Sequence, residues 1–125
     1  MKVQNISFKG YREEISLNSN SEKMRNELNN ISPCLSLIGN HCLPKGKDLF
    51  VKLRSGYNSD YLTAYYIDRN ERKSVIIANE SERSIDGNGL IFIRKVFEGL
   101  KKYNPTDFDN ILDTFSKQTE NKLSE

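Results

Sequence analysis

The sequence predicts a single α+β domain in which an antiparallel sheet carries about three packed helices. Two observations lead to this prediction. Between residues 49 and 78, apolar and polar side chains alternate with the period of two that marks half-buried strands. On either side, apolar residues recur every three or four positions, as along one face of an amphipathic helix. Because strands and helices are grouped along the chain rather than interleaved, the α+β class is favoured.

The N-terminal residues 4–17 predict a β-hairpin. Two short runs, 6–8 and 15–17, each alternate apolar and polar side chains. The dipeptide Lys9-Gly10 lies between them and suits a turn. These two strands are expected to extend the antiparallel sheet.

A helix is expected next, because Ser19 and Glu22 match a capping box. Its apolar stripe consists of Met24, Leu28, Ile31 and Leu35. Pro33 disfavours helical geometry in the residue before it, so the helix is predicted to end near residues 30–31, with Leu35 in the turn that follows. The stretch 39–46 is dense in turn-forming residues and is expected to be a loop.

Three strands are predicted at 49–54, 61–68 and 74–78. The connections between them are short, so they should form an antiparallel meander. In the first strand, Leu49, Val51 and Leu53 should face the core and the intervening residues should face away. The run Val75–Ile77 suggests burial on both faces of the third strand.

The C-terminal part of the chain predicts a polar loop at 79–89 and two helices. The first helix should end near Tyr103, and the second should begin at Thr106, which is a good N-cap residue. The apolar stripe of the second helix is Phe108, Ile111, Leu112 and Phe115. We therefore expect one domain spanning residues 1–116, followed by a frayed tail at 117–125.

Composition excludes several classes of protein. The chain has 125 residues, of which 36% are apolar and 29% charged, and its formal net charge is +2. This balance argues against a dedicated polyanion binder, whose isoelectric point usually lies above about 9. No apolar run approaches the roughly 20 residues of a membrane-spanning helix, and the first ten residues lack the apolar stretch of a signal peptide. A cytoplasmic protein with no membrane partner is expected, and its oligomeric state is left open.

The residues that could carry catalytic or metal chemistry are few. Cys34, His41 and Cys42 lie near one another in sequence, and a Cys–His pair can make an activated thiolate. A zinc site needs four ligands, whereas these are only three, so we expect structural roles for them and no metal, cofactor or catalytic residue. The segment Asp86–Gly89 begins like a calcium loop, but Phe97 stands where the bidentate Glu is required.

A basic and aromatic surface is the strongest candidate site. From Lys45 to Lys73 there are seven basic and four acidic residues, with tyrosines among them. The predicted binding residues are Lys52, Arg54, Tyr57, Tyr61, Tyr65, Arg69 and Arg72. Tyr and Arg are the usual anchors of protein–protein interfaces. The same residue types can bind single-stranded nucleic acid, or can simply form a solvated sheet face.

The favoured function is that of a small, soluble, non-enzymatic binding protein that occludes a macromolecular partner, most readily a protein. Inhibitors, immunity proteins and phage or mobile-element regulators are examples of this class, and the abundance of Asn, Lys, Ile and Ser is common in bacterial and phage proteins. The alternative is a nucleic-acid-binding module that uses the same strand face. A small toxin or nuclease-like enzyme is the third hypothesis.

Overall fold

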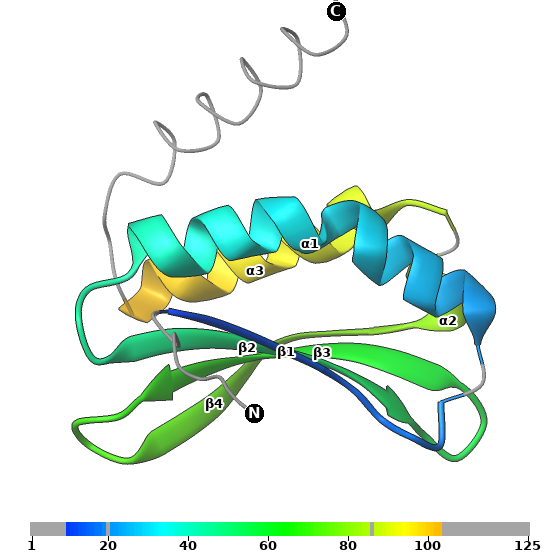
Figure 1. Ribbon diagram of the computed structural model, residues 1–125, viewed down its shortest axis with the longest axis horizontal. Helices are drawn as coiled ribbons and strands as arrows, with labels where there is room; N and C mark the ends of the chain where they lie inside the picture. The colour runs from blue at the N-terminus through cyan, green and yellow to red at the C-terminus, as the bar shows by residue number, and fades with distance from the viewer. Residues whose placement is uncertain (1–9, 20, 86, 104–125) are drawn as a thin grey trace, which may run out of the picture.

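The computed structural model describes residues 10–19, 21–85 and 87–103. Over these ranges the chain forms a four-stranded sheet with helices packed on one face (Figure 1). The elements are, in chain order, β1 (Tyr11–Ile15), α1 (Glu22–Cys42), β2 (Lys47–Ser55), β3 (Asp60–Asp68), β4 (Lys73–Ser81), α2 (Glu82–Ile85) and α3 (Gly89–Tyr103). The α+β class is thus confirmed. The last predicted helix and the predicted tail lie outside the described residues.

The sheet is mixed, which corrects the predicted antiparallel arrangement. Its strand order is β1-β2-β3-β4. β2, β3 and β4 form the expected antiparallel meander, but β1 runs parallel to β2, with Tyr11 opposite Leu49 and Ile15 opposite Leu53. A parallel pair needs a long crossover between its strands, and α1 is that crossover. The predicted second strand at 15–17 is wrong, because the strand that the structure shows, β1, ends at Ile15 and Leu17 is 99% exposed in the turn that follows. Residues 4–9, which include the predicted first strand, lie outside the described ranges.

Helix α1 continues through Pro33 to Cys42, so the predicted end near residue 31 is wrong. A proline inside a helix removes one backbone hydrogen bond and costs about 3 kcal/mol. The continued helix buries Leu35, Ile38 and Cys42 in the core. Burial of a Leu or Ile side chain stabilises by roughly 1.5–3 kcal/mol, so packing outweighs the local cost of the proline.

The N-cap of α1 is Ser21 rather than the predicted Ser19. The Ser21 hydroxyl accepts a hydrogen bond from the Met24 backbone nitrogen at 3.1 Å. Ser19 is fully buried, and its hydroxyl donates to Asp60 Oδ2 at 2.6 Å. The Ser21 backbone nitrogen donates to the same oxygen at 3.1 Å. Asp60 thereby ties the start of α1 to the start of β3.

The core lies between the sheet and the helix layer formed by α1 and α3. Leu49, Val51 and Leu53 of β2 are fully buried, as their alternation predicts. Phe92 of α3 is the largest fully buried side chain among the described residues. The predicted polar loop at 79–89 is partly structured, because β4 extends to Ser81 and the short helix α2 follows.

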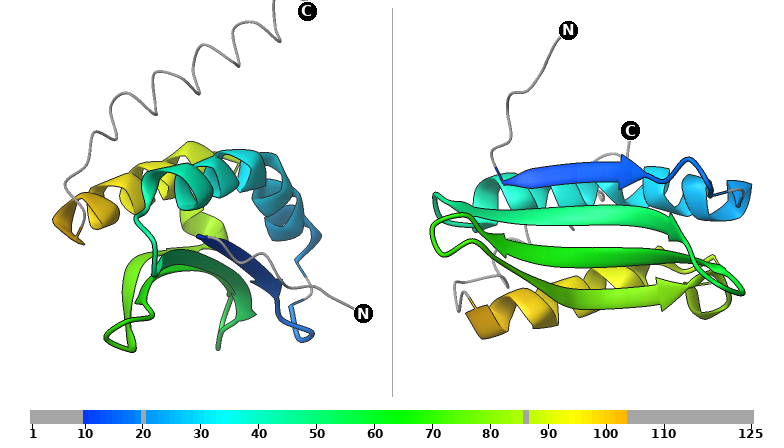
Figure 2. Two further views of the ribbon diagram at one scale, coloured as in Figure 1. Left: turned by 60° about the vertical axis from the view of Figure 1, so that its left-hand side comes forward. Right: turned by 90° about the horizontal axis from the view of Figure 1, so that it is seen from below.

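Both helices of that layer lie on the same side of the sheet (Figure 2). No described segment covers the opposite side, which we call the outer face. The two hairpin ends of the sheet bend away from the helices, so the outer face is concave along the strands (Figures 1 and 2).

Candidate functional site

The outer face carries one row of side chains that crosses all four strands. Arg12, Phe50, Tyr65 and Ile76 are opposite one another in the pairing of β1, β2, β3 and β4, and we call them the central row. The Arg12 guanidinium lies 4.8 Å from the centroid of the Phe50 ring. The Phe50 and Tyr65 rings are stacked, with centroids 5.6 Å apart. Ile76 completes the row, and 57% of its surface is exposed.

A polar row lies beside the central row. Lys52 Nζ is 3.3 Å from Glu14 Oε1, which joins β2 to β1 across the outer face. On the other side, the Thr63 hydroxyl donates to Asn79 Oδ1 at 2.6 Å. The charge on Lys52 is therefore partly balanced within the protein rather than presented alone.

Arg54 is held by three neighbours on the outer face. Its guanidinium lies 5.0 Å from the Tyr61 ring centroid. Arg54 Nε donates to Thr63 Oγ1 at 2.9 Å, and its Nη2 donates to Asn79 Oδ1 at 3.4 Å. These contacts hold the guanidinium against β3 and β4, and Arg54 and Tyr61 form a second cation–aromatic pair beside the central row.

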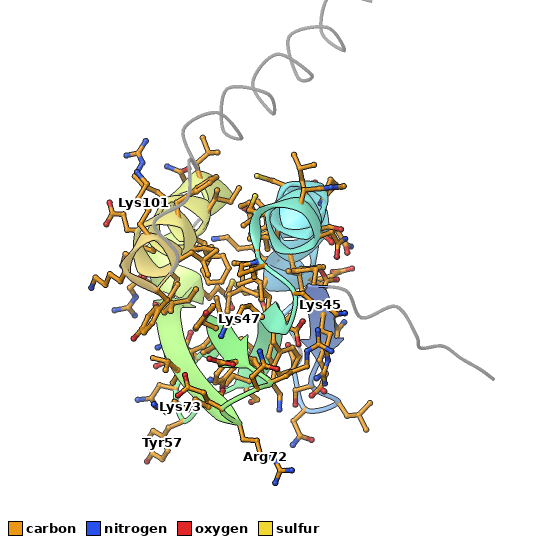
Figure 3. All side chains as sticks on the ribbon, turned by 90° about the vertical axis from the view of Figure 1, so that its left-hand side faces the viewer. Lys45, Lys47, Tyr57, Arg72, Lys73 and Lys101 are labelled. Carbon is orange, nitrogen blue, oxygen red and sulfur yellow. The ribbon has the colours of Figure 1, made fainter. Side chains whose placement is uncertain are left out.

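The remaining three predicted residues lie at the two ends of the sheet. Tyr57, in the β2–β3 connection, is 98% exposed. Arg69 and Arg72 lie in the β3–β4 turn, where Arg72 has a positive φ of 56°. Figure 3 shows Tyr57 and Arg72 projecting beyond the sheet on the side away from the helices. The structure thus brings together Lys52, Arg54, Tyr61 and Tyr65 and leaves the other three at the margins.

Two members of the central row were missed by sequence reasoning. Arg12 is on β1, and it lies outside both runs of the predicted hairpin. Ile76 was expected to be buried with its neighbours, but a β-bulge in the β3–β4 pairing leaves Ile76 opposite Tyr65 on the outer face. Ile77 instead packs against the core. A bulge inserts one extra residue into a strand, and the residues around this one gave no sequence signal that predicted it.

Cys34 and Cys42 are both buried on the core side of α1. Burial raises the pKa of Cys34 to about 11, and burial together with the nearby Cys34 raises the pKa of Cys42 to about 12. Both thiols are therefore protonated near neutral pH, and the thiolate is the nucleophilic form. His41 is exposed in the last turn of the helix. Across the described ranges, no three His, Cys, Asp or Glu residues are grouped so that they could hold a metal ion.

Three kinds of comparison with known proteins were made for this chain. The chain matches no family model, no curated protein and no solved structure at a significant level. None of the helices in the described part of the chain is both long enough and apolar enough to span a membrane.

Proposed function

We propose that this chain is a small non-enzymatic binding protein whose outer face holds a protein partner. The observation that supports this most is the central row, an uninterrupted cation–aromatic–aliphatic strip across all four strands. No described element packs on it. Arg, Tyr and Phe are enriched where interfaces carry their binding energy, because they bury a large area while keeping polar groups available.

The way in which the aromatic rings are arranged favours a protein over single-stranded nucleic acid. Binding of bases requires free ring faces on which they can stack. Here Phe50 lies between Arg12 and Tyr65, and the Tyr61 ring lies against Arg54. The glutamate paired with Lys52 further lowers the positive potential that a phosphate backbone needs.

The mechanism that fits this surface is occlusion. The concave outer face would receive a convex segment of the partner, with the central row as its anchor. The exposed Tyr57 and Arg72 extend from opposite ends of the sheet and could contact the rim of the same partner. Inhibitors, immunity proteins and phage-encoded regulators act in this way, by covering a surface that the partner needs for its own activity.

We expect Ile76→Glu to abolish capture of the partner from a lysate of the source cells. The change places a charge in the central row without disturbing the core, since Ile76 is 57% exposed. Leu90→Glu is the matched control, because Leu90 is 62% exposed but lies on α3, in the helix layer. The measurement is quantitative mass spectrometry of proteins retained by each immobilised variant, with and without nuclease.

A protein retained by the wild type and by Leu90→Glu, but lost with Ile76→Glu, supports the proposal. Retention by the wild type and by both variants places the interface elsewhere. Loss of binding after nuclease treatment would instead favour the nucleic-acid alternative.

A further inference from the structure

A polar depression lies at the end of the sheet where β2 begins and where β3 turns into β4. Lys45, Gly46, Arg69 and Asn70 line it, and its volume is about 280 Å³. No acidic side chain is among these lining residues. Figure 3 looks at the molecule from this end, with Lys45, Lys47, Arg72 and Lys73 all in view. The depression is separate from the central row.

Arg69 is held in place from behind by a buried carboxylate. Its Nε lies 3.0 Å from Asp48 Oδ2, and the Asp48 side chain is only 3% exposed. The Arg69 side chain itself is 52% exposed. The contact with Asp48 is made by Nε, and an arginine held through Nε can offer its two terminal nitrogens to a ligand. A guanidinium fixed in this way presents a planar pair of donors, the geometry that matches two oxygens of a carboxylate or phosphate.

Hydrogen bonds from Asp68 and Gly46 fix the turn that carries Arg69. Asp68 Oδ1 accepts hydrogen bonds from the backbone nitrogens of Asn70 and Glu71, at 3.0 and 3.2 Å. Its Oδ2 accepts from Lys47 Nζ at 2.5 Å, and this hydrogen bond holds the pKa of Asp68 below its usual range. The Arg69 backbone nitrogen donates to the Gly46 carbonyl at 2.8 Å. The two sides of the depression are therefore fastened to each other.

The burial of Asp48 calls for an explanation. Its Oδ1 has no hydrogen-bond partner within the part of the chain that the structure describes. A buried carboxylate with one unpaired oxygen costs free energy, and many buried ion pairs add little net stability. Orientation of Arg69 toward a ligand would account for keeping such a group, because carboxylates commonly fix the donors that touch a bound ion or substrate.

We propose that this depression binds a phosphate group, either as the free ion or as a phosphate ester. The terminal nitrogens of Arg69 donate to two phosphate oxygens, and the exposed Lys45, which also lines the depression, supplies the second positive charge. The Asn70 side-chain amide is a further donor within the lining. Asp48 sits behind the guanidinium and repels the anion, so the site should be of modest affinity.

The test is a titration of the ¹⁵N-labelled full chain with inorganic phosphate at constant ionic strength, followed through the backbone amide signals of Gly46 and Asn70. We expect saturable shifts in the wild type. Lys45→Gln should weaken binding about tenfold, the size of effect that one charge-assisted hydrogen bond produces. Lys73→Gln is the matched control, because Lys73 is an exposed cation just beyond the same turn that does not line the depression, and it should change affinity less than twofold.

Asp48→Ala separates orientation from charge. It removes a negative charge, so a site that depends on net charge alone would bind phosphate more tightly. If Asp48 fixes the position of Arg69, Asp48→Ala weakens phosphate binding instead. A thermal melt checks that this variant is folded. If Asp48→Ala does not fold, Lys45→Gln alone tests the site. Non-saturable shifts, equal losses with Lys45→Gln and Lys73→Gln, or tighter binding by folded Asp48→Ala would each overturn the proposal.

Two further ligands identify the source of the phosphate. Phenyl phosphate tests a monoester and a short oligothymidylate tests a phosphodiester, and displacement of inorganic phosphate by either one supports the site. The Ile76→Glu variant should bind phosphate as the wild type does, because Ile76 is not in the lining. Failure of this site and failure of the outer-face proposal are therefore distinguishable.

Discussion

Replacement of Phe92 by alanine should lower the free energy of unfolding by about 3–5 kcal/mol, the range for truncation of a phenylalanine in a protein core. Phe92 is fully buried on α3, within the cluster that joins the helices to the sheet. Its loss removes apolar contacts and leaves a cavity that the surrounding helices and strands fill only in part. Urea denaturation, followed by circular dichroism, measures the change.

Phe50→Ala is the control for that prediction, because it removes the same side chain from the outer face. Phe50 is half-buried, and its contacts are the Arg12 guanidinium and the Tyr65 ring. Loss of these contacts should cost only about 1–2 kcal/mol. Equal destabilisation by the two changes would contradict the assignment of one face of the sheet to the core and the other to solvent.

Gly39→Ala should lower the free energy of unfolding by about 1–3 kcal/mol, the usual cost of overpacking a close contact. In an exposed helix the same change would stabilise by up to about 1 kcal/mol, so even the sign of the effect is informative. A Cβ atom at Gly39 would lie 2.5 Å from the Gly10 carbonyl oxygen and 2.8 Å from Tyr11 Cβ. Helix α1 therefore approaches the start of β1 almost backbone to backbone.

The control for Gly39→Ala is the next residue along α1. Asn40 is exposed, and Asn40→Ala should change stability by no more than about 0.5 kcal/mol. Thermal melts compare the two variants, and hydrogen exchange at the β1 amides reports whether that strand loosens. A stabilised Gly39→Ala variant would show that α1 does not cross over β1 as described.

The predictable part of the fold is the part determined by local periodicity. Alternation correctly assigned β2 and its buried residues, such as Leu49, and the three-to-four spacing correctly assigned α3. Neither the bounds nor the direction of β1 could be predicted. Residues 11–15 do not alternate apolar and polar side chains, and a short strand has no local signal for parallel or antiparallel pairing. The predicted end of α1 was wrong because the free-energy cost of Pro33 in the helix is smaller than the stabilisation from burying Leu35 and Ile38. That burial depends on the rest of the fold.

The candidate site shows the same division. Alternation alone placed Lys52 and Arg54 on the face opposite the core, and the structure confirms that placement. Arg12 could not be assigned to the site without knowledge of strand pairing, and Ile76 could not be assigned without the bulge. The partners of each charge were also beyond sequence reasoning, because Asp48 and Arg69 are brought together by the pairing of the start of β2 with the end of β3.

The most direct test of the outer face as a binding surface is chemical labelling of tyrosines in the free protein and in the captured complex. Tyr65 lies in the central row, whereas Tyr103 is 45% exposed and lies at the end of α3, so the chain contains its own control. We predict that the complex protects Tyr65 from nitration and leaves Tyr103 as reactive as in the free protein. Protection of Tyr103 with unchanged reactivity of Tyr65 would contradict the account and would place the partner on the helix layer.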